Sequence, residues 1–256
     1  MNDDPFRSRS QSLNSDQTAP EPQPEPQAVR VAAPEAAPYV TYAIIAVTSL
    51  IYVLQLATSD LPIVFLAKDN DLIRRGEFWR LLTPALVHGS LPHILFNMYA
   101  LLAFGTSLER HFGHGRFFLL YVLGAFAGNV MSFLLTQADS VGASTAIFAL
   151  IGAEGVFLVQ NRKLFAGQFR NAIGNVIFVV AVNLFLGLAP TIDNWGHIGG
   201  LLGGLIFASF AGPLWEIEGI NPTYRFVDQR EFGAVLIGLV TVLFIFGGLA
   251  FWGFVR

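Results

Sequence analysis

The chain has 256 residues, of which 54% are hydrophobic and only 13% charged, with a mean hydropathy of +0.56. Globular domains carry about 25% charged residues, so this composition indicates a protein of the lipid bilayer. The absence of cysteine excludes disulfides, thiol catalysis and cysteine-ligated metals. A net charge of −3 excludes a strongly basic nucleic-acid-binding protein.

Residues 1–38 differ in composition from the rest of the chain. They hold proline at positions 20, 22, 24, 26, 34 and 38 among Gln and Glu residues, with few large aliphatic side chains. Such a segment cannot bury enough apolar surface to offset the entropy lost on ordering. We expect a disordered tail that acts as a solvated tether rather than as a binding site for a partner.

Seven apolar runs follow, and each approaches the roughly 20 residues of a membrane-spanning helix. They are Val40–Ala57, Leu91–Leu108, Phe117–Thr136, Ala143–Val159, Ala172–Ala189, Trp195–Ala211 and Phe232–Phe254. Helices are expected because the backbone must satisfy its own hydrogen bonds in lipid. The stretch 58–90 mixes charged and large apolar residues, which is typical of a segment that lies in the membrane interface.

The distribution of Lys and Arg sets the orientation of a membrane protein. With the N-terminus inside, the inner segments hold most of the 15 basic residues: Arg7, Arg9, Arg30, Arg110, Arg116, Arg162, Lys163, Arg170, Arg225 and Arg230. The outer segments then hold Lys68, Arg74, Arg75, Arg80 and Arg256. The pattern favours a cytoplasmic N-terminus. Because the sequence shows no targeting segment, the bacterial plasma membrane is the simplest location, and an organelle membrane stays open.

Four polar side chains stand out, because polar groups within spans are costly and usually have a role. They are His93, Asn97, Ser144 and His197. Each lies in the first turns of the second, fourth or sixth span, and all three of these spans begin at the outer face. Topology alone therefore predicts that the four side chains gather at a shallow depth on that side.

Taken singly, Ser144 is typical of helix packing and His197 of an interhelical hydrogen bond. Together they suggest chemistry, because a serine becomes a nucleophile when an imidazole takes its proton. Small residues recur every four positions in the sixth span, at 196, 200, 204, 208 and 212, and in the fourth span, at 145, 149 and 153. Two such faces can pack closely, which predicts that His197 lies near Ser144.

His93 and Asn97 are four residues apart and so share one helix face. A metal site would need further ligands at suitable spacing, and the sequence does not supply them. Donation to a developing oxyanion is an alternative, aided by the dipole at a helix N-terminus. A purely structural role for the pair stays open, and His88 is a plausible auxiliary polar residue.

Four short motifs occur in order along the chain: Glu77-Phe78-Trp79-Arg80, His88 with His93 to Asn97, Gly142-Ala143-Ser144-Thr145, and Gly196-His197-Ile198-Gly199-Gly200. With them the sequence resembles the rhomboid intramembrane serine proteases over about residues 41–212. Each motif is weak alone, but four in the right order, each at the right span, are specific.

The resemblance implies an all-α polytopic membrane helical bundle. Its six-span catalytic core would cover residues 39–213, after the cytoplasmic tail 1–38, and residues 214–256 would form a linker and a seventh transmembrane helix. Ser144 would be the nucleophile and His197 the general base of a dyad without a third carboxylate. His93, Asn97 and the backbone N–H of Ser144 would form the oxyanion hole.

The family also implies roles for residues around the dyad. Arg80 and Glu109 would brace the first outer loop, and the ring of Phe148 would pack against His197. No cofactor and no metal are implied, and the partners would be transmembrane protein substrates in the lipid bilayer, with no nucleic acid. Thr145 departs from the family, which usually has glycine there, and it would narrow substrate access or alter the oxyanion geometry.

Two rival functions follow from the same residues. Thr145 would suit a catalytically inactive rhomboid-like protein that binds membrane clients. Glu154, near the middle of the fourth span, would suit a small-solute transporter. We expect instead that Glu154 has a structural partner such as Asn129, Asn175 or Asn183. The sequence leaves the substrate and the oligomeric state open.

Overall fold

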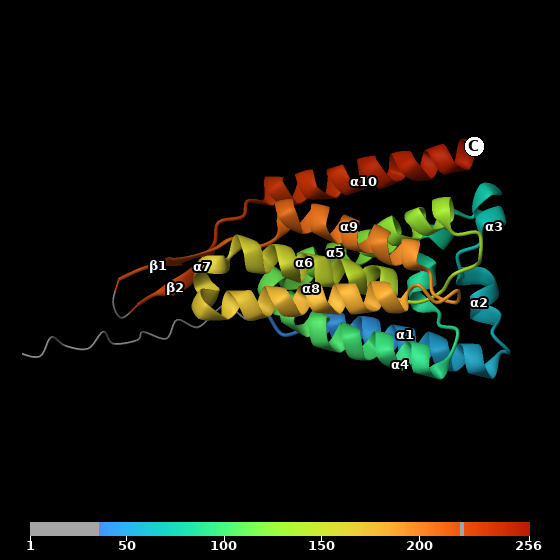
Figure 1. Ribbon diagram of the computed structural model, residues 1–256, viewed down its shortest axis with the longest axis horizontal. Helices are drawn as coiled ribbons and strands as arrows, with labels where there is room; N and C mark the ends of the chain where they lie inside the picture. The colour runs from blue at the N-terminus through green and yellow to red at the C-terminus, as the bar shows by residue number, and fades with distance from the viewer. Residues whose placement is uncertain (1–35, 221–222) are drawn as a thin grey trace, which may run out of the picture. The chain divides into compact units, whose positions relative to one another are not determined.

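The computed structural model describes residues 36–220 and 223–256, and most of them are helical (Figure 1). The disordered tail expected for residues 1–38 therefore lies, apart from its last three residues, outside the described part of the chain. The helices are α1 (Tyr39–Ala57), α2 (Leu61–Leu66), α3 (Asn70–Arg74), η1 (Phe78–Leu81), η2 (Thr83–Leu86), α4 (Leu91–Ala100), η3 (Leu101–Gly105), α5 (Thr106–Leu135), α6 (Ser144–Gln160), α7 (Arg162–Phe165), η4 (Ala166–Gln168), α8 (Phe169–Leu186), α9 (Asn194–Ala211) and α10 (Phe232–Val255). The strands are β1 (Trp215–Glu218) and β2 (Arg225–Asp228).

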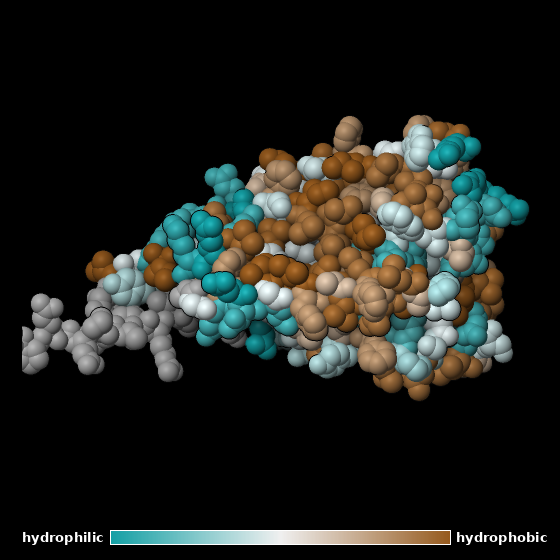
Figure 2. Space-filling view, viewed as in Figure 1, coloured by the Kyte–Doolittle hydropathy of each residue, from teal (hydrophilic) through white to brown (hydrophobic). Residues whose placement is uncertain are grey.

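Five helical stretches in the described residues are long and apolar enough to cross a membrane. They are Tyr39–Ala57, Leu91–Phe112, His114–Leu135, Phe169–Leu186 and Phe232–Val255. The 17-residue helix α6 and the glycine-rich helix α9 occupy the fourth and sixth predicted spans. Figure 2 shows hydrophobic residues across the middle of the molecule and hydrophilic residues gathered towards its two ends. The chain is a polytopic helical membrane bundle, and its total of seven spans stays a prediction.

The second and third spans meet at a single residue. Helix α4 continues through the π-helical turn η3 into α5, and the backbone leaves helical geometry at Gly113, where φ is +74°. A positive φ of this kind favours glycine because glycine has no Cβ to clash. The two spans are therefore joined by a tight turn, with no intervening loop.

Helices α5, α6 and α9 form the centre of the bundle and approach one another through small residues. A Cβ added at Gly200 would overlap the carbonyl of Thr145, and one added at Gly204 would overlap the carbonyl of Ala149. The close packing of α6 on α9 is what the small-residue spacing predicts. Helix α8 differs, because Val176 is its only buried residue.

The first outer loop, residues 58–90, folds into the short helices α2, α3, η1 and η2. Arg80 is 3% exposed and bonds to the Glu77 carboxylate at 2.6 Å and to the carbonyl of Ala67 at 2.7 Å. Arg80 thus braces this loop, as expected. The expectation for Glu109 is wrong, because its carboxylate accepts the backbone N–H groups of Val40 and Thr41 and so anchors the start of α1.

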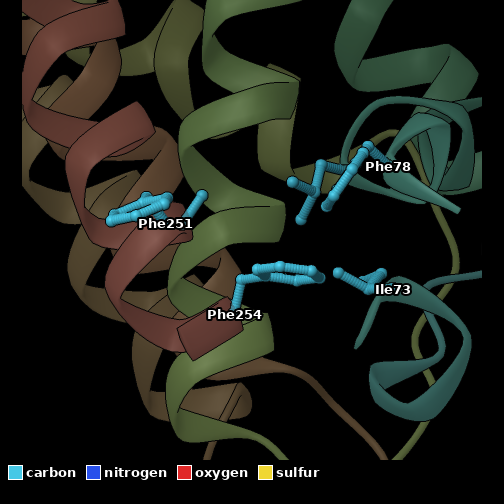
Figure 3. A pocket seen from close by; sticks show the side chains of 6 residues that line it. Ile73, Phe78, Phe251 and Phe254 are labelled. Carbon is cyan, nitrogen blue, oxygen red and sulfur yellow. The ribbon is translucent and has the colours of Figure 1, made fainter. Parts of the chain in front are cut away.

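The end of α10 packs on the first outer loop. The rings of Phe254 and Phe78 meet edge to face, with centroids 5.3 Å apart. Together with Ile73 and Phe251 they line an apolar cavity of about 370 Å³ (Figure 3). The last helix therefore contacts the loop at the end of the molecule where α2 and α3 lie.

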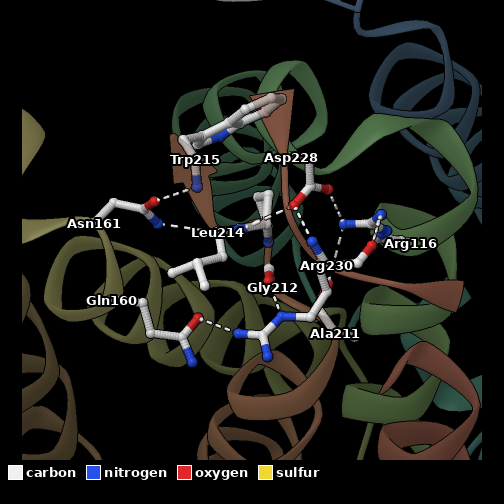
Figure 4. A network of polar contacts seen from close by, with 10 residues as sticks. Arg116, Gln160, Asn161, Ala211, Gly212, Leu214, Trp215, Asp228 and Arg230 are labelled. Carbon is white, nitrogen blue, oxygen red and sulfur yellow. Dashed lines mark hydrogen bonds and ion pairs between the residues drawn. The ribbon is translucent and has the colours of Figure 1, made fainter. Parts of the chain in front are cut away.

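At the opposite end, the linker before α10 forms a β-hairpin that the sequence reading did not anticipate. Strands β1 and β2 pair antiparallel, with Trp215 opposite Asp228. Asp228 binds Arg116 of α5 at 2.6 Å, and the guanidinium of Arg230 donates to the carbonyl of Gly212 at 2.9 Å (Figure 4). Asn161 accepts the Trp215 N–H at 2.8 Å. These bonds tie the linker to α5, α6 and α9 at this end of the bundle. We name this end the inner end after the expected orientation, and we name the opposite end, where α2 and α3 lie, the outer end.

Candidate active site

Ser144 and His197 lie side by side at the beginnings of two helices. Ser144 is the first residue of α6, and His197 lies in the first turn of α9. The His197 Nε2 and Ser144 Oγ atoms are 2.9 Å apart, which is hydrogen-bond distance. The close packing of α6 on α9 brings together residues that are 53 positions apart in sequence.

The imidazole of His197 is held by an aromatic ring on α6, the helix that begins with Ser144. Phe148, one turn after Ser144, stacks on the imidazole with centroids 4.3 Å apart and ring planes 12° apart. Within the described residues, Nδ1 of His197 makes no hydrogen bond. The ring is therefore oriented by Phe148 on its face and by the contact of Nε2 with Ser144.

His93 of α4 lies at the same site. A Cβ added at Gly142 would lie 2.7 Å from the His93 ring, so the imidazole packs directly on the loop two residues before Ser144. Gly142 has φ of +120°, a conformation that side chains rarely adopt. Glycine is thus required at position 142 for two reasons: the positive φ of the backbone, and the His93 imidazole that occupies the space of a side chain.

Asn97 is buried, at 6% exposure, and lies one turn further along α4. Its amide donates to the His93 carbonyl on its own helix at 2.9 Å. No hydrogen bond joins Asn97 to Ser144 in the part of the chain that the structure describes. Of the four predicted site residues, the structure brings Ser144, His197 and His93 together and leaves Asn97 bonded to its own helix.

His88 has a more definite position than an auxiliary residue requires. Its Nε2 accepts the Ala143 N–H at 3.3 Å, immediately before Ser144. Burial, with a smaller contribution from nearby His93, lowers the pKa of His88 to about 3, so the ring is neutral and able to accept this bond. Gln55 of α1 holds the backbone of His88 through two hydrogen bonds, of 2.8 and 3.1 Å.

Thr145 points into the packing between helices. A Cβ added at Gly128 of α5 would lie 2.5 Å from the Thr145 Cβ, and one added at Gly196 of α9 would lie 3.2 Å from its methyl group. The threonine therefore fills space that these two glycines leave free. Thr145 is 5% exposed.

Glu154 does not bind the partners expected for it. One of its carboxylate oxygens is buried and makes no hydrogen bond within the described residues. The amides of Asn129 and Asn183 donate instead to the carbonyls of Ala125 and Val179 on their own helices.

Asp193, Thr136 and Lys68 were not predicted as site residues, but hydrogen bonds link them to one another and to the first turn of α9, which carries His197. Asp193 caps α9 by accepting the Gly196 N–H at 3.1 Å. An aspartate just before a helical run is a recognisable start signal, so this residue could have been found. Thr136 and Lys68 carry no such local signal, because their partners lie far away in sequence.

Within residues 36–220 and 223–256, no group of three or more His, Cys, Asp or Glu side chains is arranged to hold a metal ion. The described site thus consists of a serine, histidines and backbone amides at one end of a helical bundle. Such a fold and site define a polytopic membrane protein whose candidate chemistry is hydrolytic.

Comparison with known proteins identifies the family. Residues 75–213, more than half of the chain, match the Rhomboid domain. The chain is 40% identical over 188 residues to the rhomboid protease GluP of Bacillus subtilis, across 73% of this chain and 35% of that protein. The chain belongs to the rhomboid family, whose members are generally intramembrane serine proteases.

Plant relatives are similar over the same region. The chain is 37% identical over 180 residues to RHOMBOID-like protein 9, chloroplastic, of Arabidopsis thaliana, across 70% of this chain and 40% of that protein. It is 34% identical over 183 residues to RHOMBOID-like protein 2 of the same plant, across 70% of this chain and 57% of that protein. The chain thus spans between about a third and three fifths of the length of these relatives.

Proposed function

We propose that this protein is an intramembrane serine protease that uses a Ser144–His197 dyad. It hydrolyses peptide bonds in or near the transmembrane segments of membrane-anchored proteins. The observation that carries the proposal is the 2.9 Å contact between Ser144 Oγ and His197 Nε2. The family supports it, since rhomboid proteases act on transmembrane substrates in the bilayer.

The geometry supports a two-step mechanism. Ser144 Oγ attacks the scissile carbonyl as its proton passes to His197 Nε2, and the imidazolium then protonates the leaving amine. Water, activated by the same imidazole, hydrolyses the acyl-enzyme. The Phe148 ring stacks on the His197 imidazole at an interplanar angle of 12°. This stacking restricts the tilt of the imidazole and so keeps the imidazole aligned for the proton transfer.

The oxyanion forms next to Ser144 N–H, which as the first amide of α6 lacks a partner within its own helix. His93 lies against the preceding loop and is placed to donate as well. Asn97 would join them by exchanging its bond to the His93 carbonyl for one to the substrate oxygen. Donors of this kind typically contribute about 3 kcal/mol each to transition-state stabilisation.

The proposal includes an arrangement in the membrane. The catalytic core covers residues 39–213 and the seventh helix follows in residues 214–256. The N-terminus is cytoplasmic, and Ser144 opens towards the outer face of a bacterial plasma membrane. The unequal distribution of Lys and Arg supports this orientation.

Cleavage of a single-span model substrate in liposomes tests the dyad. Ser144→Ala and His197→Ala should each lower kcat/KM by about 10³-fold or more, because the two residues act as one unit. Ser209→Ala is a matched control. It removes a hydroxyl that bonds only to its own helix, at the Leu205 carbonyl, and should leave cleavage unchanged.

Labelling with a fluorophosphonate separates the protease from an inactive rhomboid-like protein. Folded wild-type protein should be labelled at Ser144, and Ser144→Ala should not. Absence of labelling in the folded wild type would favour the inactive client-binding protein, and equal cleavage by all variants would exclude the dyad.

A further inference from the structure

A chain of hydrogen bonds links the first outer loop to the first turn of α9, and Thr136 is at its centre. The Thr136 carbonyl accepts hydrogen bonds from Lys68 Nζ and from Asn70 Nδ2, each at 3.0 Å. The Thr136 hydroxyl donates to Asp193 Oδ1 at 2.8 Å. One residue at the end of α5 therefore contacts both the first outer loop and the start of α9.

Asp193 connects Thr136 to the turn of α9 that carries His197. The same carboxylate oxygen accepts the Gly196 N–H at 3.1 Å, and the Asp193 carbonyl accepts the His197 N–H at 3.2 Å. Burial alone would raise the pKa of Asp193. The nearby hydroxyls of Ser132, Thr136 and Ser140 and the Gly196 amide together hold that pKa below its usual value. The carboxylate is therefore ionised, and its Oδ1 is held by Thr136 and Gly196.

The serine is tied to the same loop. Lys68 is fully buried, and its Nζ also donates to the Ala138 carbonyl at 2.6 Å. Its backbone pairs with that of Ser140 through hydrogen bonds of 3.0 and 3.2 Å. The Gly142 N–H donates to the Pro84 carbonyl at 2.9 Å. The segment from Thr136 to Ser144 is thus held at several points against the first outer loop.

We propose that Thr136 and Asp193 are positioning residues that hold His197 in register with Ser144. The bond from the Thr136 hydroxyl to the Asp193 carboxylate joins the segment that carries the serine to the helix turn that carries the histidine. The inference rests on the proposed function, because it assigns a role in that reaction. Neither side chain touches the dyad, so both act through the backbone that they hold.

The reaction is sensitive to such positioning. Proton transfer between Ser144 and His197 needs a short, aligned contact, and a displacement of about 1 Å can cost about 100-fold in rate. The bond between Thr136 and Asp193 is one of several restraints on α9, so its loss should permit a smaller displacement. We expect about a tenfold effect on kcat and little effect on KM, since the two side chains bond to each other and to the backbone and are not among the groups assigned to contact the substrate.

The test compares Thr136→Val with Thr136→Ser in the full chain, in liposomes. Valine keeps the shape and the backbone carbonyl that accepts from Lys68, but it removes the hydroxyl. Thr136→Val should lower kcat about tenfold and leave KM within about twofold. It should also slow fluorophosphonate labelling about tenfold. Thr136→Ser restores the hydroxyl and should remain within about twofold of wild type.

Asp193→Ala removes both the cap and the link and should lower kcat further than Thr136→Val. If Asp193→Ala does not fold, the valine and serine variants still decide. Ser209→Ala removes a hydroxyl from the opposite end of α9 and should match wild type in every assay.

The outcomes separate this inference from the proposed function. Equal kcat for Thr136→Val and Thr136→Ser, with Ser144→Ala inactive, would overturn the positioning role. The proposed function as a serine protease would still hold. A lower melting temperature for Thr136→Val with unchanged kcat would also overturn it, since that is a structural effect alone. Equal cleavage by wild type and Ser144→Ala would overturn both.

Discussion

Each end of the bundle has a cation bonded to distant parts of the chain, but the two cations differ in burial. At the outer end, Lys68 is fully buried and bonds to two backbone carbonyls of the segment that leads to Ser144. At the inner end, the side chains of Arg116 and Asp228 are 23% and 19% exposed, and they join α5 to the hairpin (Figure 4).

The difference shows what each set of contacts can do. Lys68 is itself fully buried, and a hydrogen bond from a charged group contributes about 1.5–3 kcal/mol. A partly exposed ion pair contributes about 1 kcal/mol or less, because water solvates either partner when the other is removed. The outer contacts can therefore fix the geometry of the dyad, whereas the inner contacts anchor the linker and α10.

Lys68→Met should give the largest effect. Methionine has a similar length but cannot donate, so the Ala138 carbonyl loses its bond from the Lys68 ammonium, and the Thr136 carbonyl keeps only its bond from Asn70. We expect the free energy of unfolding to fall by about 3 kcal/mol, together with a clear loss of cleavage. Thermal melting in detergent and the liposome assay measure the two, and an unchanged melting temperature would contradict the comparison.

Acid should weaken the bond between Thr136 and Asp193. Because the folded pKa of Asp193 is lowered from 3.8, its carboxylate stabilises the fold fully above that value and loses the effect as pH falls through the lowered pKa. Thr136→Val removes one donor to the carboxylate and should cost about 1 kcal/mol at pH 6. The difference in melting temperature from wild type should shrink well below pH 3.8, and a constant difference would count against the assignment.

Arg116→Met is the inner counterpart of Lys68→Met. It leaves Asp228 partly solvated and still accepting the backbone N–H of Leu214 at 2.9 Å. The free energy of unfolding should fall by less than about 1 kcal/mol, with kcat unchanged. A loss of stability as large as that of Lys68→Met would break the distinction between the two ends.

Phe254→Ala should have the smallest effect. It removes one ring of the pair with Phe78, and such pairs contribute about 0.5–1.5 kcal/mol beyond burial. Since Phe254 is 39% exposed, we expect the low end of that range. Faster trypsin cleavage at Arg74 or Arg75 in proteoliposomes would report loosening of the first outer loop, and unchanged cleavage would show that α10 does not support it.

The helices and the meeting of Ser144 with His197 could be predicted from the sequence. Hydropathy marks the spans, and the small-residue spacing at Gly200 and Gly204 requires a close neighbour. The contacts that hold the outer loops could not be predicted. Lys68 and Thr136 are 68 residues apart, and the local sequence around either residue does not indicate that it contacts the other.

The positions of the Thr145 and Glu109 side chains could not be predicted either. The surrounding residues determine where each side chain lies, and for Glu109 they contradict the role that the family pattern implied. Thr145 fits because Gly128 and Gly196 lie opposite it, and Glu109 faces the start of α1 because α5 reaches that end of the bundle. Side-chain direction depends on tertiary packing, which a pattern along one chain does not contain.

The turn at Gly113 has a mechanical consequence for the site at the far end of α4. The stretch Leu91–Phe112 has 22 residues and is about 33 Å long at 1.5 Å per residue. With its base fixed at a one-residue pivot, it acts as a lever. A rotation of about 2° there moves the outer end by about 1 Å, as the length of the helix requires. A small change in the backbone at Gly113 would therefore carry His93 towards or away from the Ser144 loop.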